Sequence, residues 1–390
     1  ATSASSSPPA SSPPPTTNDA PTSVSSTPTT SPVSLASSSP SSSPSTTAPA
    51  PAAKKWPGKS IHSVLTSGGD NYQNYQTRIF WSSYQLVKKM PGGEHLTGFT
   101  RILHAVNPDF LMKEIPTYMA NEGLKSGYDY PVKNRPIAIL QWLRAAEKDP
   151  NMIQGAWIAM LECDYVWFRP LFAPGDAYDR NVIGVQYQYD YIYPAAEDLA
   201  PCISKFYGGG DRSIIPRSGP APVVMRLDEW MKVGPNYVNV SAAIESDNVC
   251  KEKLGWVREM YAWDIAITLI PDLKIETSKT PQSLLIGQPP FEESRGNAAM
   301  YHYTWGPYYY DTKQNKKLIY KWEKREVQSI EEVLKPSLLP LPPPFQEGIL
   351  LEFDVPLNVQ KHNIVVDFIN VMNEAIKNVV PMEMPTPNAQ

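Results

Sequence analysis

The sequence is poor in cysteine, which argues against disulfide-scaffold and zinc-finger proteins. Its 390 residues contain only Cys163, Cys202 and Cys250. Three cysteines are too few for a disulfide scaffold, and their spacing does not match a zinc-binding motif. Cys202 and Cys250 could form one disulfide, which would leave Cys163 unpaired, or all three could be free thiols.

Long apolar runs and an excess of basic charge are also missing. No run of apolar residues approaches the ~18 to 20 needed to span a bilayer. The net charge is −4 and the pI is near 5.8, so the chain offers no broad basic surface and we expect no nucleic-acid partner. The turn at residues 67–70 matches neither G-x-G-x-x-G nor a P-loop, which excludes those two nucleotide sites. The chain begins at Ala1 without a signal sequence. We therefore expect membrane attachment only through an anchor that this chain does not contain.

Proline, by contrast, is abundant, and much of it lies at the N-terminus. Residues 1–53 are almost wholly Ser, Pro, Thr and Ala and include no aromatic residue. Such a segment cannot bury a core, and its composition is typical of O-glycosylated, partly polyproline II stems. We predict a disordered stem over residues 1–55. Together with the glycosylation sequon Asn239-Val240-Ser241, it favours a protein of the secretory pathway.

The most informative stretch is an apolar run that ends in two acids. Five consecutive apolar residues at 157–161 precede Glu162 and, one residue later, Asp164. The run predicts a strand buried on both faces, as in the centre of a parallel sheet. Carboxyl ends of such strands face the ligand crevice, so both carboxylates should point into it. They repel each other unless a cation lies between them, and a hard divalent cation is the common partner. The alternative is a pair of solvated acids.

The segments around this run predict an α/β fold with a mostly parallel central sheet flanked by helices. Strands at 61–66 and 99–104, joined by a helix at 71–89, form a β-α-β unit. Further helices are expected at 134–148, 254–269 and 363–379, the last after a proline-rich linker at 340–344. We predict one main domain over residues 56–330 and a C-terminal part over 331–390 that docks on it.

Two residues in these segments are further candidates for chemistry. His302 lies on a late strand expected at 298–304, and a single histidine among aromatic residues is most often part of a core. Glu259 lies on the helix at 254–269, where burial without a partner would be expensive. It therefore has either a structural ion pair or a substrate or catalytic role. The aromatic loop at 305–310 has faces that could receive sugar rings or proline-rich peptides.

A series of short motifs runs through the folded part of the chain. In order they are Phe99-Thr100-Arg101-Ile102-Leu103-His104, Glu114-Ile115-Pro116-Thr117, Asn134-Arg135-Pro136, Glu162-x-Asp164, Gly255-Trp256-Val257 with Glu259-Met260-Tyr261, and His302-Tyr303-Thr304. In these motifs the chain resembles the plant and green-algal hydroxyproline O-arabinosyltransferases, from Ile61 to the C-terminal helix. It departs from them at Tyr165, at Asp264 and at Pro307, where plant members carry a histidine, a small apolar residue and a cysteine.

The resemblance implies a GT-A-like glycosyltransferase domain in the Golgi or ER lumen. It implies transfer of L-arabinofuranose, with retention, from UDP-L-arabinofuranose to hydroxyproline in polyproline II segments of secreted and cell-wall glycoproteins such as extensins. One alternative is a peptidyl-serine or hydroxyproline galactosyltransferase, because that class shares the Gly-Trp-x-x-Glu-Met-Tyr motif. An alternative of another kind is a non-catalytic wall glycoprotein that binds polyproline helices.

On this resemblance we expect three residues to hold Mn²⁺ or Mg²⁺: Glu162, Asp164 and His302. The candidates for donor contacts are Thr66, Ser67, Asp70, Arg101, Asn134, Arg135 and Gln141. Of these, Arg101 and Arg135 are expected on the phosphates, or else in ion pairs with Asp109 or Glu114. A retaining reaction needs either a nucleophile on the sugar face opposite the leaving group or front-side attack assisted by UDP itself. Glu259 and Asp264 are the carboxylates to test as nucleophiles. The acceptor groove could be lined by Trp81, Tyr84, Trp305 and Tyr308, or these could be core.

Overall fold

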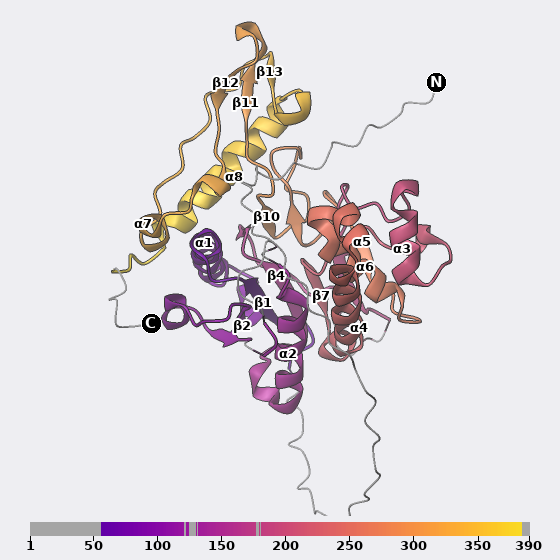
Figure 1. Cartoon of the computed structure of the whole chain (residues 1–390). Coiled ribbons are helices and arrows are strands. Elements are labelled where there is room, and N and C mark those ends of the chain that lie inside the picture. Colours follow the sequence, from indigo (N-terminus) through magenta and orange to yellow (C-terminus); the bar gives the residue numbers. More distant parts are fainter. Residues whose placement is uncertain are drawn as a thin grey trace, which may run out of the picture. The chain divides into compact units, whose positions relative to one another are not determined.

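The computed structural model describes residues 56–383 apart from 121, 125–129, 131, 177–178 and 180. The predicted stem at residues 1–55 therefore lies outside the described residues. Residues 54–390 group into one compact unit, in which Figure 1 shows a central set of strands with helices around it. None of the helices among the described residues is long and apolar enough to cross a bilayer.

The central sheet has seven strands in the order β3-β2-β1-β4-β7-β6-β8. Every neighbouring pair is parallel except those that involve β7, which runs antiparallel to β4 and β6. This confirms the predicted α/β class with a mostly parallel sheet. The strands are β1 (Ile61–Ser67), β2 (Leu96–Leu103), β3 (Thr117–Met119), β4 (Trp157–Glu162), β6 (Gly184–Tyr187), β7 (Val223–Met225) and β8 (Glu276–Ser278).

Strands β1 and β4 form the middle of this sheet. All of β1 and the first five residues of β4 are buried, as expected for strands covered on both faces. Thr66 is in register with Glu162, and Ser67 with Leu103. The carboxyl ends of β1, β2 and β4 therefore lie at one edge of the sheet, where a ligand crevice is expected.

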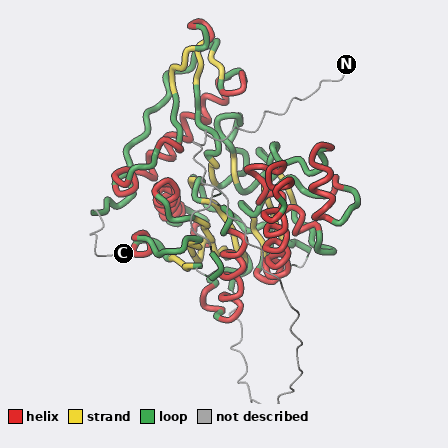
Figure 2. Tube along the Cα trace, in the orientation of Figure 1, coloured by secondary structure: helices red, strands yellow, loops and turns green. Residues whose placement is uncertain are grey.

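Two groups of helices cover the strands, and Figure 2 shows the helices around the yellow strands. On one side α2 packs on α4, which packs on α6, while α1 contacts α7, α8 and β5. The C-terminal helix α8 thus lies against the first helix of the fold. The helices are α1 (Asn71–Val87), α2 (Arg135–Lys148), α3 (Ala200–Tyr207), α4 (Leu227–Ser246), α5 (Asn248–Leu254), α6 (Arg258–Thr268), α7 (Ile330–Leu334) and α8 (Val359–Lys377).

The helix expected at 254–269 is interrupted near its start. Gly255 has φ 60°, ψ −141°, which an α-helix cannot contain, so α5 ends at Leu254 and a short 3-10 turn precedes α6. Glu259 consequently lies in the first turn of α6. The longest helix, α4, was not expected, because Gly234 and Pro235 interrupt its apolar pattern; it carries the sequon residue Asn239 on an exposed position.

Two small sheets complete the fold. One has the order β5-β10-β9 and the other β12-β11-β13. Their strands are β5 (Tyr165–Trp167), β9 (Ile286–Gly287), β10 (Met300–His302), β11 (Tyr309–Asp311), β12 (Lys317–Tyr320) and β13 (Ile349–Leu350). A Cys202–Cys250 disulfide joins α3 to α5, and Cys163 is free and buried. The structure thus contains the one bridge that the sequence left open.

Candidate metal centre

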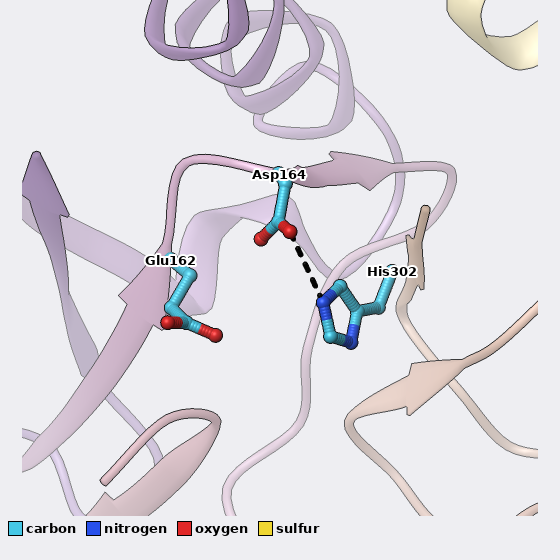
Figure 3. A group of neighbouring side chains, drawn as sticks. All are labelled: Glu162, Asp164 and His302. Carbon is cyan, nitrogen blue, oxygen red and sulfur yellow. Dashed lines mark hydrogen bonds and ion pairs between the residues drawn. The ribbon is translucent and has the colours of Figure 1, made fainter. Parts of the chain in front are cut away.

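Glu162, Asp164 and His302 come together where β4 ends. Glu162 is the last residue of β4, and Asp164 lies in the two-residue turn that leads to β5. Strand β10 pairs antiparallel with β5 and places His302 opposite Tyr165. His302 Nε2 lies 3.2 Å from Asp164 Oδ2, and Figure 3 shows the Glu162 carboxylate facing the same space. Two residues separated by one position, and a third that is 138 positions from Asp164, therefore form one cluster.

The donor atoms of this cluster suit a divalent cation. One ligand atom from each residue lies within 4.8 Å of the others. Carboxylate oxygens and imidazole nitrogens are ligands that divalent cations take in proteins. Tyr165 donates a hydrogen bond to Glu162, and the Thr304 hydroxyl lies 3.0 Å from His302 Nδ1. Such outer contacts hold ligand side chains in orientation.

Each carboxylate of the cluster also faces a cation from the protein. Lys324 Nζ lies 2.6 Å from Asp164 Oδ2, and Arg135 Nη2 lies 2.5 Å from Glu162 Oε1. Burial alone would raise the pKa of the Asp164 carboxyl, but Lys324 and then His302 reverse this and leave its pKa well below the usual value. Burial lowers the pKa of Lys324, but Asp164 raises it by more than burial lowers it, so the ammonium stays charged. The acid pair is thus neutralised internally.

Arg135 connects this cluster to Glu259. Its guanidinium contacts Glu162 and also lies 3.4 Å from Glu259 Oε2, while the Tyr237 hydroxyl donates to the same Glu259 carboxylate. Burial raises the pKa of Glu259, and Arg135 and Tyr237 counter only part of that rise. The ion pair that was one alternative for Glu259 is present, and it joins Glu259 to a metal-ligand candidate.

Asp264 has different surroundings. Its side chain is fully buried and accepts a hydrogen bond from the Ser218 backbone N–H, 2.9 Å from Oδ2. Burial raises its pKa well above the ordinary value, and the single hydrogen bond offsets little of this. Among the described contacts, Glu259 shares a partner with a cluster residue and Asp264 does not.

Arg101 lies in an internal network and not at the cluster. Its side chain is fully buried, and two of its nitrogens lie 2.8 and 2.5 Å from the Asp109 carboxylate. Its Nε donates to the Ser67 hydroxyl at 2.7 Å. The ion pair with Asp109, which the sequence left open as an alternative for Arg101, is therefore present. The same guanidinium also engages the Ser67 hydroxyl in a hydrogen bond.

The other residues expected at the donor have local partners. Asp70 caps α1 by accepting from the Gln73 backbone at 2.8 Å, and Thr66 donates to the Leu161 carbonyl. Gln141 hydrogen-bonds the backbone of Glu122, and Asn134 is buried at the start of α2. Of the donor candidates, Arg135 is the one that the structure brings onto a carboxylate of the cluster.

Sequence reasoning missed Lys324 and Tyr237. Lys324 lies in the short 3-10 helix η8 (Lys324–Glu326), within a charged stretch that resembles an ordinary solvated surface. Its side chain is nevertheless only 9% exposed. Lys324 is 160 positions from Asp164 in the sequence, so the residues next to it give no indication of this pairing. Tyr237 lies on α4, which the sequence did not predict.

The aromatic residues proposed for an acceptor groove separate into two groups. Trp81 and Tyr84 stack on each other with ring centroids 5.7 Å apart, and Tyr84 is buried, so this pair belongs to the core. Trp305 and Tyr308 follow β10 and are partly exposed. The Trp305 ring contacts Tyr191, whereas Tyr308 stacks on Tyr310.

Taken together, the fold and the cluster define an α/β protein with a candidate divalent-metal centre at the carboxyl end of its central strand. Residues 61–276, more than half of the chain, match the model of the hydroxyproline O-arabinosyltransferase family N-terminal domain. The chain belongs to this family. His302 and Lys324 lie beyond the matched region, so the C-terminal part of the chain contributes to the candidate centre.

Curated relatives agree with this assignment. Hydroxyproline O-arabinosyltransferase 2 of Arabidopsis thaliana is 32% identical over 250 residues, covering 63% of this chain and 65% of the relative. Hydroxyproline O-arabinosyltransferase PLENTY of Lotus japonicus is 35% identical over 250 residues, covering 63% and 64%. The chain thus spans just under two thirds of the length of these relatives.

Among solved structures the similarity is low. A glycosyltransferase involved in glycosylation of the major capsid of PBCV-1 has 13% identity and a TM-score of 0.33, covering 63% of this chain and 93% of that chain. The galactosyltransferase LgtC, in complex with donor and acceptor sugar analogues, has the same identity and TM-score, covering 62% and 87%.

Proposed function

We propose that this protein is a metal-dependent, retaining glycosyltransferase with a GT-A-type domain, which moves L-arabinofuranose from UDP-L-arabinofuranose to peptidyl hydroxyproline. The observation that carries the proposal is the convergence of Glu162, Asp164 and His302 at the strand ends of a chain in this family. A binding module would have no need for such a cluster. When bound there, Mn²⁺ or Mg²⁺ would stabilise the negative charge that develops on the leaving diphosphate.

The protein's own cations would take part in donor binding. Lys324 and Arg135 are each held beside one cluster carboxylate in a largely buried position. A divalent metal would compete with both for those carboxylates, and a diphosphate arriving with the metal offers new acceptors to the same two side chains. In this proposal both cations turn toward the phosphates when the donor binds.

The carboxylate for the retaining step is Glu259 in this proposal, because it alone of the two candidates is joined to the cluster. Arg135 links it to Glu162, and Tyr237 orients it. Asp264, which the backbone of Ser218 satisfies, is assigned a structural role. Glu259→Gln should therefore reduce turnover by orders of magnitude, and Asp264→Asn should leave much of it.

We also propose a Golgi or ER lumen location. Disulfides such as Cys202–Cys250 form and persist in oxidising compartments. The Ser/Pro-rich composition of residues 1–53 and the exposed sequon asparagine, Asn239, agree with that compartment.

The deciding experiment is a donor panel. The protein is incubated with a synthetic hydroxyproline peptide and one UDP-sugar at a time, with Mn²⁺ or with EDTA, and the peptide mass is measured. An added mass of one pentose, formed from UDP-L-arabinofuranose only when metal is present, is the expected result. An added mass of one hexose, formed from UDP-galactose, would show that the transferred sugar is galactose instead of arabinose. An unmodified peptide with every donor would refute the proposal.

A further inference from the structure

A connected series of aromatic rings leads from the candidate metal centre to the protein surface. It begins at His302, whose ring centroid lies 6.1 Å from that of Tyr189. Tyr189 contacts Tyr191 at 5.1 Å, and Tyr191 contacts Trp305 at 6.3 Å. Trp305 then contacts Phe353 at 5.7 Å. Exposure rises along the series, because Tyr189 is fully buried, Tyr191 and Trp305 are partly exposed and Phe353 is 44% exposed.

The backbone holds Phe353 in an unfavourable conformation. Phe353 has φ 60° and the following Asp354 has φ 59°, so two consecutive non-glycine residues are left-handed. Each such residue costs on the order of 1 kcal/mol and persists only where the surroundings impose it. The bend places this large apolar side chain against Trp305 and Phe291, where it still remains 44% exposed. Strain spent on exposing an aromatic ring indicates a binding role.

The rings fit the dimensions of a polyproline II helix. Such a helix rises ~3.1 Å per residue, so the partly exposed neighbouring rings, Tyr191 with Trp305 at 6.3 Å and Trp305 with Phe353 at 5.7 Å, match about two residues each. Proline rings stack well on aromatic faces, and a preformed helix loses little entropy when it binds. Because Tyr189 is buried, a peptide would contact only Tyr191, Trp305 and Phe353, and its end beyond Tyr191 would be the one nearest to His302.

The chain packs its own proline-rich segment in a comparable way. The Tyr320 hydroxyl donates to the Pro340 carbonyl at 2.9 Å, and Pro343 and Pro344 lie around a small cavity with Tyr309 and Phe345. Aromatic residues of this fold thus already line a cavity with prolines and hold a proline segment by a hydroxyl-to-carbonyl hydrogen bond.

We propose that Tyr191, Trp305 and Phe353 form the acceptor track, a surface that binds a hydroxyproline-rich polyproline II peptide several residues beyond the residue being modified. This inference rests on the proposed function and extends it by assigning the acceptor site. It implies that affinity depends on peptide length. A peptide of three residues spans ~9 Å, whereas one of nine residues spans ~28 Å and has length to contact all three rings while one of its residues lies at the metal centre.

The test is peptide binding, measured by fluorescence anisotropy with labelled peptides of three and of nine hydroxyprolines and no donor present. The principal variant is Phe353→Gly, because glycine adopts φ 60° without steric cost and the variant should therefore keep the same backbone conformation. We expect it to weaken binding of the nine-residue peptide about three- to tenfold and to leave the weaker binding of the three-residue peptide unchanged. Phe353→Tyr should restore the affinity.

A matched control is Phe172→Ser, which removes another exposed phenylalanine, 51% exposed, that lies outside the track. It should bind both peptides as the unmodified protein does. Equal affinity for the two peptide lengths, or no effect of Phe353→Gly on the longer one, would overturn the acceptor track, as would tighter binding of an arabinan oligosaccharide than of either peptide. Because no donor is used, loss of sugar transfer with intact length-dependent binding would count against the proposed function alone.

Discussion

Replacing Lys324 with glutamine should destabilise the protein and make it respond more strongly to divalent metal. Lys324 Nζ lies 2.6 Å from Asp164 Oδ2, and the side chains are 9% and 17% exposed. Removal of one partner of a buried ion pair costs about 3 to 5 kcal/mol, because the other charge stays buried without compensation. With about 2 °C of melting temperature per kcal/mol for a domain of this size, we expect Lys324→Gln to melt roughly 6 to 10 °C lower in EDTA.

Metal should reverse much of this loss. In the unmodified protein Mn²⁺ must displace Lys324 from Asp164, whereas in the variant the carboxylate has no cation to release. The rise in melting temperature on adding Mn²⁺ should therefore be larger for Lys324→Gln than for the unmodified protein, since a ligand that binds the folded state more tightly stabilises it more. If UDP is then added, the variant should gain less than the unmodified protein, because the lysine is no longer present to contact the phosphates.

The assay is thermal melting followed by circular dichroism, in EDTA, in Mn²⁺, and in Mn²⁺ with UDP. Lys321→Gln is the matched control: Lys321 is 42% exposed and pairs with the exposed Glu326, so its loss should change stability by less than ~1 kcal/mol. Equal melting of Lys324→Gln and the unmodified protein in EDTA, or an equal Mn²⁺ response, would refute the competition between lysine and metal.

Three other changes test the same structure. Asp164→Asn should abolish both turnover and the Mn²⁺-induced rise in melting temperature. The double variant Asp164→Asn/Lys324→Gln should be more stable than Asp164→Asn alone but should still not respond to Mn²⁺. A double-mutant cycle would measure the coupling between the two side chains. Burial raises the pKa of Asp264, so the stability that its protonated form contributes is complete below about pH 4 and is lost as the pH rises through the raised pKa. Asp264→Asn should therefore reduce the fall in melting temperature between pH 4 and pH 8. An unchanged fall would contradict this reasoning. Cys202→Ser opens a disulfide of sequence separation 48 and should cost about 4 kcal/mol, measured by urea unfolding; a loss under ~1 kcal/mol would show that the bridge constrains little.

Some parts of the site could be predicted because their signal is local. The apolar run of β4, with Glu162 and Asp164 after it, predicted a buried strand and two carboxylates at its end, and both are present. A strand pattern depends on neighbouring residues, so a short window contains it. His302 became a ligand candidate through the family resemblance, and its approach to Asp164 depends on the pairing of β10 with β5.

Other parts could not be predicted, because each of these side chains has several possible partners and only the folded chain selects among them. Arg101 and Arg135 looked alike as phosphate candidates, yet Arg101 is bound by Asp109 in the interior while Arg135 lies between Glu162 and Glu259. Lys324 looked like part of a solvated surface. The choice of an ion-pair partner is made by distance in space and by burial, neither of which a residue's immediate neighbours report.

By itself the amino-acid sequence determined the α/β class, the position of the two strand-end acids and the family, because hydrophobic period and short motifs are properties of consecutive residues. The tertiary structure decided which cations neutralise the acids, which carboxylate adjoins them and which aromatic rings remain at the surface. Burial and tertiary pairing set the energy of each charge and each ring, and both arise only when separate segments of the chain pack together.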